Sequence, residues 1–234
     1  MNFRIFESVA ELSAGAADAI VDELSGAEGA VVALSGGSTP RPIYELLGQD
    51  ERMRQLATTA ITWVTGDERC VPPGHPDSNG TMIEQTLFAS GIPPSHRFLR
   101  FETELGDAAA VASGFEERWQ TLKIDGLTLS ILGLGTDGHT ASLFPGTAVL
   151  DIEDRIAAEV FVPRLKSWRV TLTLPVLRQA STMFVLAAGD DKREAIARVS
   201  AGEDLPIGRV VKGSPDCWWL VDRAAYPGMS GGPR

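Results

Sequence analysis

The stretch LTLSILGLGTDGHTASLFPG, residues 127–146, decides the fold because it joins an almost wholly apolar segment to a turn rich in glycine. The apolar half predicts a strand buried on both faces, as in a parallel sheet covered by helices. Three glycines of the turn fall in the spacing G-x-G-x-x-G, which suggests dinucleotide binding. However, Asp137 lies where a pyrophosphate would bind, and Pro145 comes too early for the long helix that such a turn opens. We therefore interpret the stretch as a strand-end turn that presents Asp137 and His139.

The rest of the chain repeats this alternation of short apolar runs with longer helical patterns. AVVAL at residues 30–34 is a second nearly continuous apolar strand. There is no internal repeat and no low-complexity linker. These patterns predict one α/β domain over residues 1–226, with three layers (α/β/α) and a mostly parallel, doubly wound, modified Rossmann-like sheet. Residues 227–234 are rich in glycine and proline and predict a flexible tail.

Composition excludes several classes of function. The chain has 234 residues and a net charge of −10, which argues against nucleic acid as a partner because that binding needs a basic face. It has neither an apolar run of membrane-spanning length nor a signal-peptide pattern, so we expect a cytoplasmic protein that does not bind membranes. Cys70 and Cys217 match no metal-ligand spacing, so no metal site is expected. A local pocket for a small anion remains compatible with the acidic charge.

SGGSTP, residues 35–40, follows the strand at 30–34. Gly37 allows positive φ and close backbone approach, Ser38 or Thr39 can cap the next helix, and Pro40 suits its first turn. Such a helix N-terminus can bind a phosphate, or it can be only a well-capped turn, and the residues leave both interpretations open. The pattern of a P-loop is missing.

TGDERCVPPGHPDSN, residues 65–79, places Asp67, Glu68 and Arg69 directly after another apolar strand. A charge triplet is usually a solvated surface run. At a strand end, however, Arg69 can hold a substrate anion while the acids orient it. Arg169 at the start of a strand and Lys192 in the first turn of a helix are two further cations of this kind, and their convergence would make a phosphate clamp.

His139 is a candidate general base. Asp137, two residues before it, can fix its tautomer and raise its basicity. The competing interpretation makes Ser142 or Ser38 a nucleophile with His139 as its base, but no G-x-S-x-G elbow is present.

Taken together, LSGGSTP, TGDERCVPPGHPDSN, LGLGTDGHTASLFPG and RVTLTLPVL, in this order, closely resemble 6-phosphogluconolactonases over most of the chain. The resemblance implies hydrolysis of 6-phospho-D-glucono-1,5-lactone in the oxidative pentose phosphate pathway, without metal or organic cofactor. It implies that His139 is the base that activates water and that Asp137 orients His139. It also implies a set of residues that bind phosphate and sugar: Gly37, Ser38, Thr39, Asp67, Arg69, Arg169 and Lys192.

The chain departs from the family at PRLKSWRVTLT, residues 163–173, where members often show Lys-Pro-Pro, so the roles of Arg164 and Lys166 stay open. Two other functions are alternatives. An aldose-ketose isomerase or a glucosamine-6-phosphate deaminase resembles the Gly-Asp-Gly-His block, but the deaminases continue with Asn-Glu-Pro where this chain has SLFPG. A non-catalytic sugar-phosphate sensor is the other. We expect a monomer or a small homo-oligomer.

Overall fold

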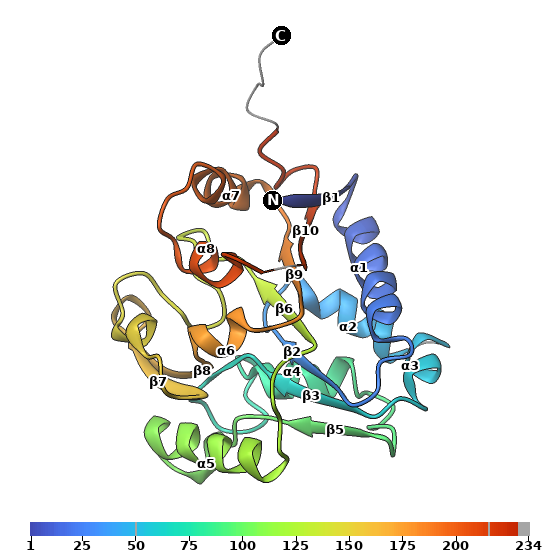
Figure 1. Ribbon diagram of the computed structural model, residues 1–234, viewed down its shortest axis with the longest axis vertical. Coiled ribbons are helices and arrows are strands. Elements are labelled where there is room, and N and C mark those ends of the chain that lie inside the picture. Colours follow the sequence, from blue (N-terminus) through green and yellow to red (C-terminus); the bar gives the residue numbers. More distant parts are fainter. Residues whose placement is uncertain (50, 215, 229–234) are drawn as a thin grey trace.

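A computed structural model describes residues 1–49, 51–214 and 216–228, so positions 229–234 of the predicted tail lie outside the described residues. Its centre is a seven-stranded sheet in the order β1-β10-β9-β6-β2-β3-β5 (Figure 1), in which all neighbouring strands are parallel. The predicted parallel α/β sheet is confirmed. Its strands are β1 (Asn2–Phe6), β2 (Ala30–Leu34), β3 (Ile61–Thr65), β5 (His96–Leu99), β6 (Leu129–Gly133), β9 (Thr182–Ala187) and β10 (Asp216–Asp222).

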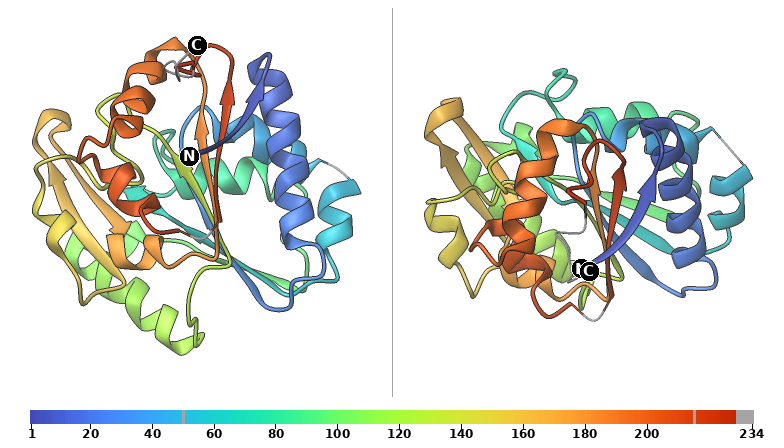
Figure 2. Two further views of the ribbon diagram at one scale, coloured as in Figure 1. Left: turned by 45° about the horizontal axis from the view of Figure 1, so that its top comes forward. Right: turned by 90° about the horizontal axis from the view of Figure 1, so that it is seen from above.

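Both faces of this sheet are buried under apolar clusters. Successive side chains of a strand point to opposite faces, so neighbouring residues pack into different clusters. In β2, Val32 packs into one apolar cluster and Ala33 into the other, and Ile131 and Leu132 of β6 divide in the same way. One face is covered by α1 (Val9–Leu24), α2 (Pro40–Gly48), α3 (Glu51–Leu56) and α4 (Asn79–Thr86). The opposite face is covered by α5 (Ala108–Thr121), α6 (Leu174–Arg178), α7 (Arg193–Ser200) and α8 (Pro206–Val211), and Figure 2 shows the resulting layers.

A second, antiparallel sheet lies on the same face as α5 and was not indicated by the sequence. It has three strands in the order β4 (Asp67–Arg69), β8 (Ser167–Leu172) and β7 (Ala157–Val162). The charge triplet Asp67–Arg69, which was expected just beyond a strand, forms the strand β4. Its pairing with β8 places Arg69 directly opposite Arg169, so the small sheet brings together two cations 100 positions apart.

The site follows from the topology of the large sheet. From β2 the chain proceeds outward through β3 to β5, whereas from β6 it proceeds in the other direction through β9 to β10. Ligands of doubly wound sheets bind where the strand order reverses, outside the carboxyl ends of the strands. Here that point lies between the turns after β2 and β6, which carry SGGSTP and GLGTDGH. Within the described ranges, no helix is both long and apolar enough to cross a membrane.

Candidate active site

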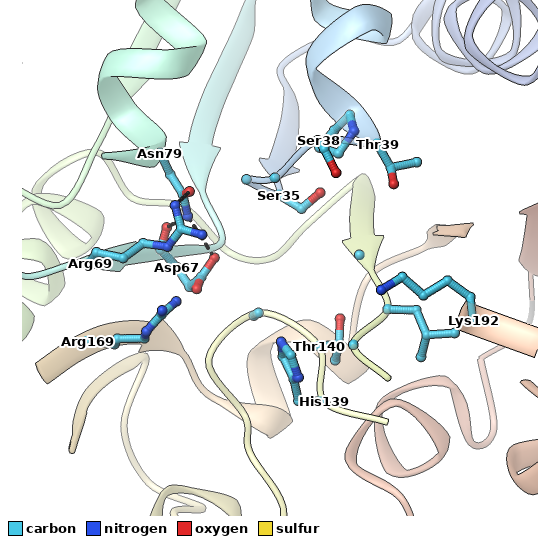
Figure 3. A pocket seen from close by; sticks show the side chains of 17 residues that line it. Ser35, Ser38, Thr39, Asp67, Arg69, Asn79, His139, Thr140, Arg169 and Lys192 are labelled. Carbon is cyan, nitrogen blue, oxygen red and sulfur yellow. Dashed lines mark hydrogen bonds between the residues drawn. The ribbon is translucent and has the colours of Figure 1, made fainter. Parts of the chain in front are cut away.

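A cavity of about 220 Å³ lies at the reversal of strand order. Its walls come from the β2–α2 turn, from β4 and β8 of the small sheet, from the N-terminus of α4, from the turn after β6 and from the segment before α7 (Figure 3). Asp137 lies behind His139 rather than in the cavity wall. The structure places all the other predicted site residues around this one cavity: Gly37, Ser38, Thr39, Asp67, Arg69, His139, Arg169 and Lys192.

The turn after β6 folds tightly upon itself. The amide of Gly135 donates to the carbonyl of His139 at 2.8 Å, and the amide of Gly138 donates to the carbonyl of Gly135 at 2.9 Å. Gly138 has φ 82°, and a Cβ on Gly135 would lie 1.9 Å from Nδ1 of His139. In this described segment the turn opens no helix, which agrees with the rejection of a dinucleotide-binding turn. Gly135 instead makes room for the imidazole.

His139 and Asp137 form a tightly coupled pair. Nδ1 of His139 lies 2.5 Å from Oδ1 of Asp137, and the same oxygen accepts the backbone amide of His139 at 3.1 Å. This leaves Nε2 for the cavity, while the ring stacks on Phe144 with centroids 4.2 Å apart. Burial opposes the charge of Asp137, but its bonds to His139 hold the pKa of this carboxyl below the usual value.

As expected, Asp137 acts to raise the basicity of His139, but burial of the ring outweighs this effect. Burial lowers the pKa of His139, and the hydrogen bond and charge of Asp137 only partly oppose this. Desolvation disfavours the charged imidazolium, so this environment keeps the ring neutral near physiological pH. A neutral imidazole is the form that can accept a proton.

Asp67 and Asn79 tie the small sheet to the turn after β6. The amide nitrogen of Asn79 donates to Oδ1 and to the backbone carbonyl of Asp67, while Arg69 donates to the amide oxygen of Asn79 at 2.8 Å. The hydroxyl of Ser142 donates to Oδ2 of Asp67 at 2.6 Å. Ser142 is therefore buried and bonded to an aspartate rather than to His139, which argues against it as the nucleophile. Sequence reasoning missed Asn79, although its place just after Ser78, before an apolar-periodic segment, marks a helix start.

The solvated-surface interpretation of the charge triplet is wrong. Asp67 and Glu68 are 5% and 2% exposed. Glu68 does not face the cavity, but accepts the amides of Asn79 and Gly80 at 2.7 Å each and that of Arg69 at 2.8 Å. Burial raises the pKa of Glu68 against these bonds. This carboxylate occupies the N-terminus of α4 and thereby positions Asn79 and Arg69.

The N-terminus of α2 faces the cavity. Pro40 opens the helix as expected, but Thr39 at the N-cap makes no side-chain capping bond, so the predicted capping by a hydroxyl did not occur. The hydroxyls of Ser38 and Thr39 instead lie at the cavity wall (Figure 3). Two further hydroxyls, those of Ser35 and Thr140, line the same cavity, are buried and have no hydrogen-bond partner within the described part of the chain. Buried polar groups without partners favour a ligand that completes them.

Lys192 reaches the cavity from the opposite wall. It occupies the N-cap position of α7, one residue before the first turn in which it was expected, and its side chain is 20% exposed. Its ammonium group pairs with Asp191 at 2.9 Å. Figure 3 shows Arg69 and Arg169 on one side of the cavity and Lys192 on the other. Three cations around one acid in the wall, Asp67, suit an anionic ligand.

The two cations left open by the sequence separate in the structure. Arg164 does not belong to the described cavity wall, but pairs with Oδ2 of Asp137 at 2.6 Å. Lys166 lines a different hollow, beside Cys70 and Trp168.

Comparison with known proteins agrees with this architecture. The family described as glucosamine-6-phosphate isomerases/6-phosphogluconolactonase matches residues 6–219. A 6-phosphogluconolactonase of Nostoc sp. is 34% identical over 208 residues, covering 85% of this chain and 84% of that protein. The structure of 6-phosphogluconolactonase from Trypanosoma brucei superposes with a TM-score of 0.84 at 28% identity, covering 96% of this chain and 97% of the other. A monomeric glucosamine-6-phosphate deaminase superposes with a TM-score of 0.80 at 22% identity, covering 96% and 98%, and so shares the fold.

Proposed function

Because the chain belongs to the glucosamine-6-phosphate isomerase/6-phosphogluconolactonase family, we propose that it hydrolyses 6-phospho-D-glucono-1,5-lactone to 6-phosphogluconate in the oxidative pentose phosphate pathway. The observation that carries the proposal is the neutral, aspartate-held imidazole of His139 in a cavity with cations on two sides. A lactone is an activated ester, so a positioned water, a base and donors for the oxyanion suffice to hydrolyse it.

His139 acts as the general base. Its Nε2 takes a proton from water as the water oxygen forms a bond to the lactone carbonyl carbon. The tetrahedral intermediate then breaks its bond to the ring oxygen, which takes the proton back from the imidazolium. The product is an open-chain acid, which releases one proton to solvent. Asp137 holds Nδ1 and so keeps Nε2 directed into the cavity.

The phosphate and the reacting carbonyl occupy opposite ends of the cavity. The N-terminus of α2, with the hydroxyls of Ser38 and Thr39 and with Lys192 across from them, suits the phosphate. Arg169 and His139 line the same cavity, and the guanidinium and the imidazole each contact Phe144, at 5.7 Å and 4.2 Å from the ring centroid. In this proposal Arg169 meets the oxyanion that develops when water attacks the lactone carbonyl at His139.

The proton released by hydrolysis provides the assay. Freshly prepared phosphogluconolactone is titrated at constant pH, and the spontaneous rate is subtracted. We expect turnover by the wild type and a loss of about 10²- to 10⁴-fold in His139→Gln, the usual contribution of general base catalysis. His75→Gln is the matched control, because His75 lies outside the cavity wall and is partly exposed. Unchanged turnover in a folded His139→Gln protein contradicts the role of this residue.

The same preparation separates the alternatives. Ammonia release from glucosamine 6-phosphate without lactone turnover identifies a deaminase instead. Binding of 6-phosphogluconate without turnover of the lactone identifies a sugar-phosphate sensor.

A further inference from the structure

Arg164 stands outside the cavity but contacts two residues that hold the catalytic base. It lies in the single turn Pro163–Leu165 that joins β7 to β8 of the small sheet. Its guanidinium is 2.6 Å from Oδ2 of Asp137 and 5.1 Å from the centre of the Phe144 ring. Phe144 is buried and stacks on the imidazole of His139. Arg164 therefore contacts both residues that hold the imidazole, although it is not part of the cavity wall.

The two oxygens of Asp137 have different partners. Oδ1 accepts both the amide and the ring nitrogen of His139, whereas Oδ2 pairs with Arg164. The torsion that rotates an aspartate carboxylate is broad and weakly restricted. Anchoring both oxygens removes this freedom, so the plane of the carboxylate, and with it the imidazole, is fixed.

We propose that Arg164 is a positioning residue for the hydrolysis proposed above: by holding Oδ2 of Asp137 it keeps Oδ1 on Nδ1 of His139 and Nε2 directed at the attacked carbonyl. The inference rests on the proposed function, since it assigns Arg164 a part in that reaction. It also gives the β7–β8 connection a function beyond covering the sheet. The turn places the guanidinium of Arg164 against Oδ2 of Asp137, the oxygen that does not contact His139.

The charge of Arg164 has a second consequence for the base. Burial lowers the pKa of His139, Asp137 and Asp67 oppose this with their negative charges, and Arg164 adds to the lowering. Arg169 of β8 is a further cation at the Phe144 ring on which the imidazole stacks. Removing the charge of Arg164 raises the pKa of His139. The imidazole then becomes protonated at a higher pH, and the acid limb of the plot of kcat against pH shifts to higher pH.

The test compares Arg164→Gln and Arg164→Lys with the wild type. We expect Arg164→Gln to lower kcat by about 3- to 30-fold, less than the ~10²-fold that a 1 Å misplacement can cost. KM and the affinity for 6-phosphogluconate, measured by calorimetry, stay within about twofold, since Arg164 does not contact the substrate. The acid limb moves to higher pH. Arg164→Lys keeps the charge, restores the position of the acid limb and recovers most of kcat.

Lys166→Gln is the matched control, because it removes a positive charge next to the same turn but from a residue that lines a different hollow. We expect it to leave kcat and the pH profile unchanged. A purely structural role of Arg164 predicts a lower melting temperature with an unmoved pH profile, and a substrate contact predicts a raised KM. Either result overturns the inference, as does wild-type behaviour of Arg164→Gln. Absence of lactone turnover in the wild type instead refutes the proposed function itself.

Discussion

Replacing Gly135 with alanine should displace the catalytic base without unfolding the turn. An added Cβ would lie 1.9 Å from Nδ1 and 2.1 Å from Cε1 of His139, and 2.8 Å from Oδ1 of Asp137. Cβ contacts essentially never fall below 3.0 Å, so the ring must retreat by about 1.1 Å, the difference between 3.0 Å and 1.9 Å. The backbone itself accommodates alanine, because Gly135 is not among the residues with positive φ.

A misplacement of this size costs about 10²-fold in rate, equivalent to about 2.7 kcal/mol in activation free energy. We therefore expect kcat of Gly135→Ala to fall by about two orders of magnitude in the proton-release assay. Its melting temperature is measured in parallel, so that a loss of kcat in a folded protein is distinguished from unfolding.

Gly126→Ala is the control for the glycine replacement, since a Cβ there meets no atom within 4 Å and Gly126 lies before β6, away from the cavity. Its kcat should equal that of the wild type. A folded Gly135→Ala protein that keeps kcat within about threefold would refute the reasoning that the position of His139 decides the rate.

Three further predictions concern the catalytic base, the phosphate contact and the N-terminus of α4. Burial lowers the pKa of His139, so the neutral base persists below the ordinary 6.5. The value of kcat/KM, which reports the free enzyme, should therefore fall to half only below pH 6.5, as initial rates between pH 5 and 8 will show. Lys192→Gln should raise KM for the phosphorylated lactone far more than for gluconolactone without phosphate; equal effects on both would exclude a phosphate contact. Glu68→Gln should destabilise the fold by about 1 to 3 kcal/mol in urea unfolding, because the backbone amides of Asn79 and Gly80 donate to different oxygens of Glu68 and the NH₂ of glutamine replaces one of the two; unchanged stability would contradict its role at α4.

Much of the site could be predicted from residues close together in the chain. The apolar strand at 129–133 followed at once by a glycine turn indicated both a covered parallel sheet and a strand-end site, because carboxyl ends of parallel strands share one edge. Asp137 and His139 are two positions apart, so their pairing required no knowledge of the fold. Asp137 between the glycines and the early Pro145 were together the grounds for rejecting a dinucleotide-binding turn.

Other features could not be inferred because they depend on contacts between distant segments. Asn79 carries no motif of its own, and it becomes part of the site only because Glu68 and Asp67 of β4 hold it there. The acid that raises the pKa of His139 is visible in the sequence, whereas the burial that outweighs it is not.

The sequence by itself determined the layered α/β fold, the cavity at the strand ends and the pair Asp137 and His139, because periodicity and neighbouring residues encode local structure. Only the tertiary structure decided what surrounds that pair. The antiparallel sheet of β4, β8 and β7 sets Arg69 against Arg169 and brings Arg164 to the outer oxygen of Asp137. Strand pairing across about 100 residues is selected by the packing of the whole core, and no local pattern records it.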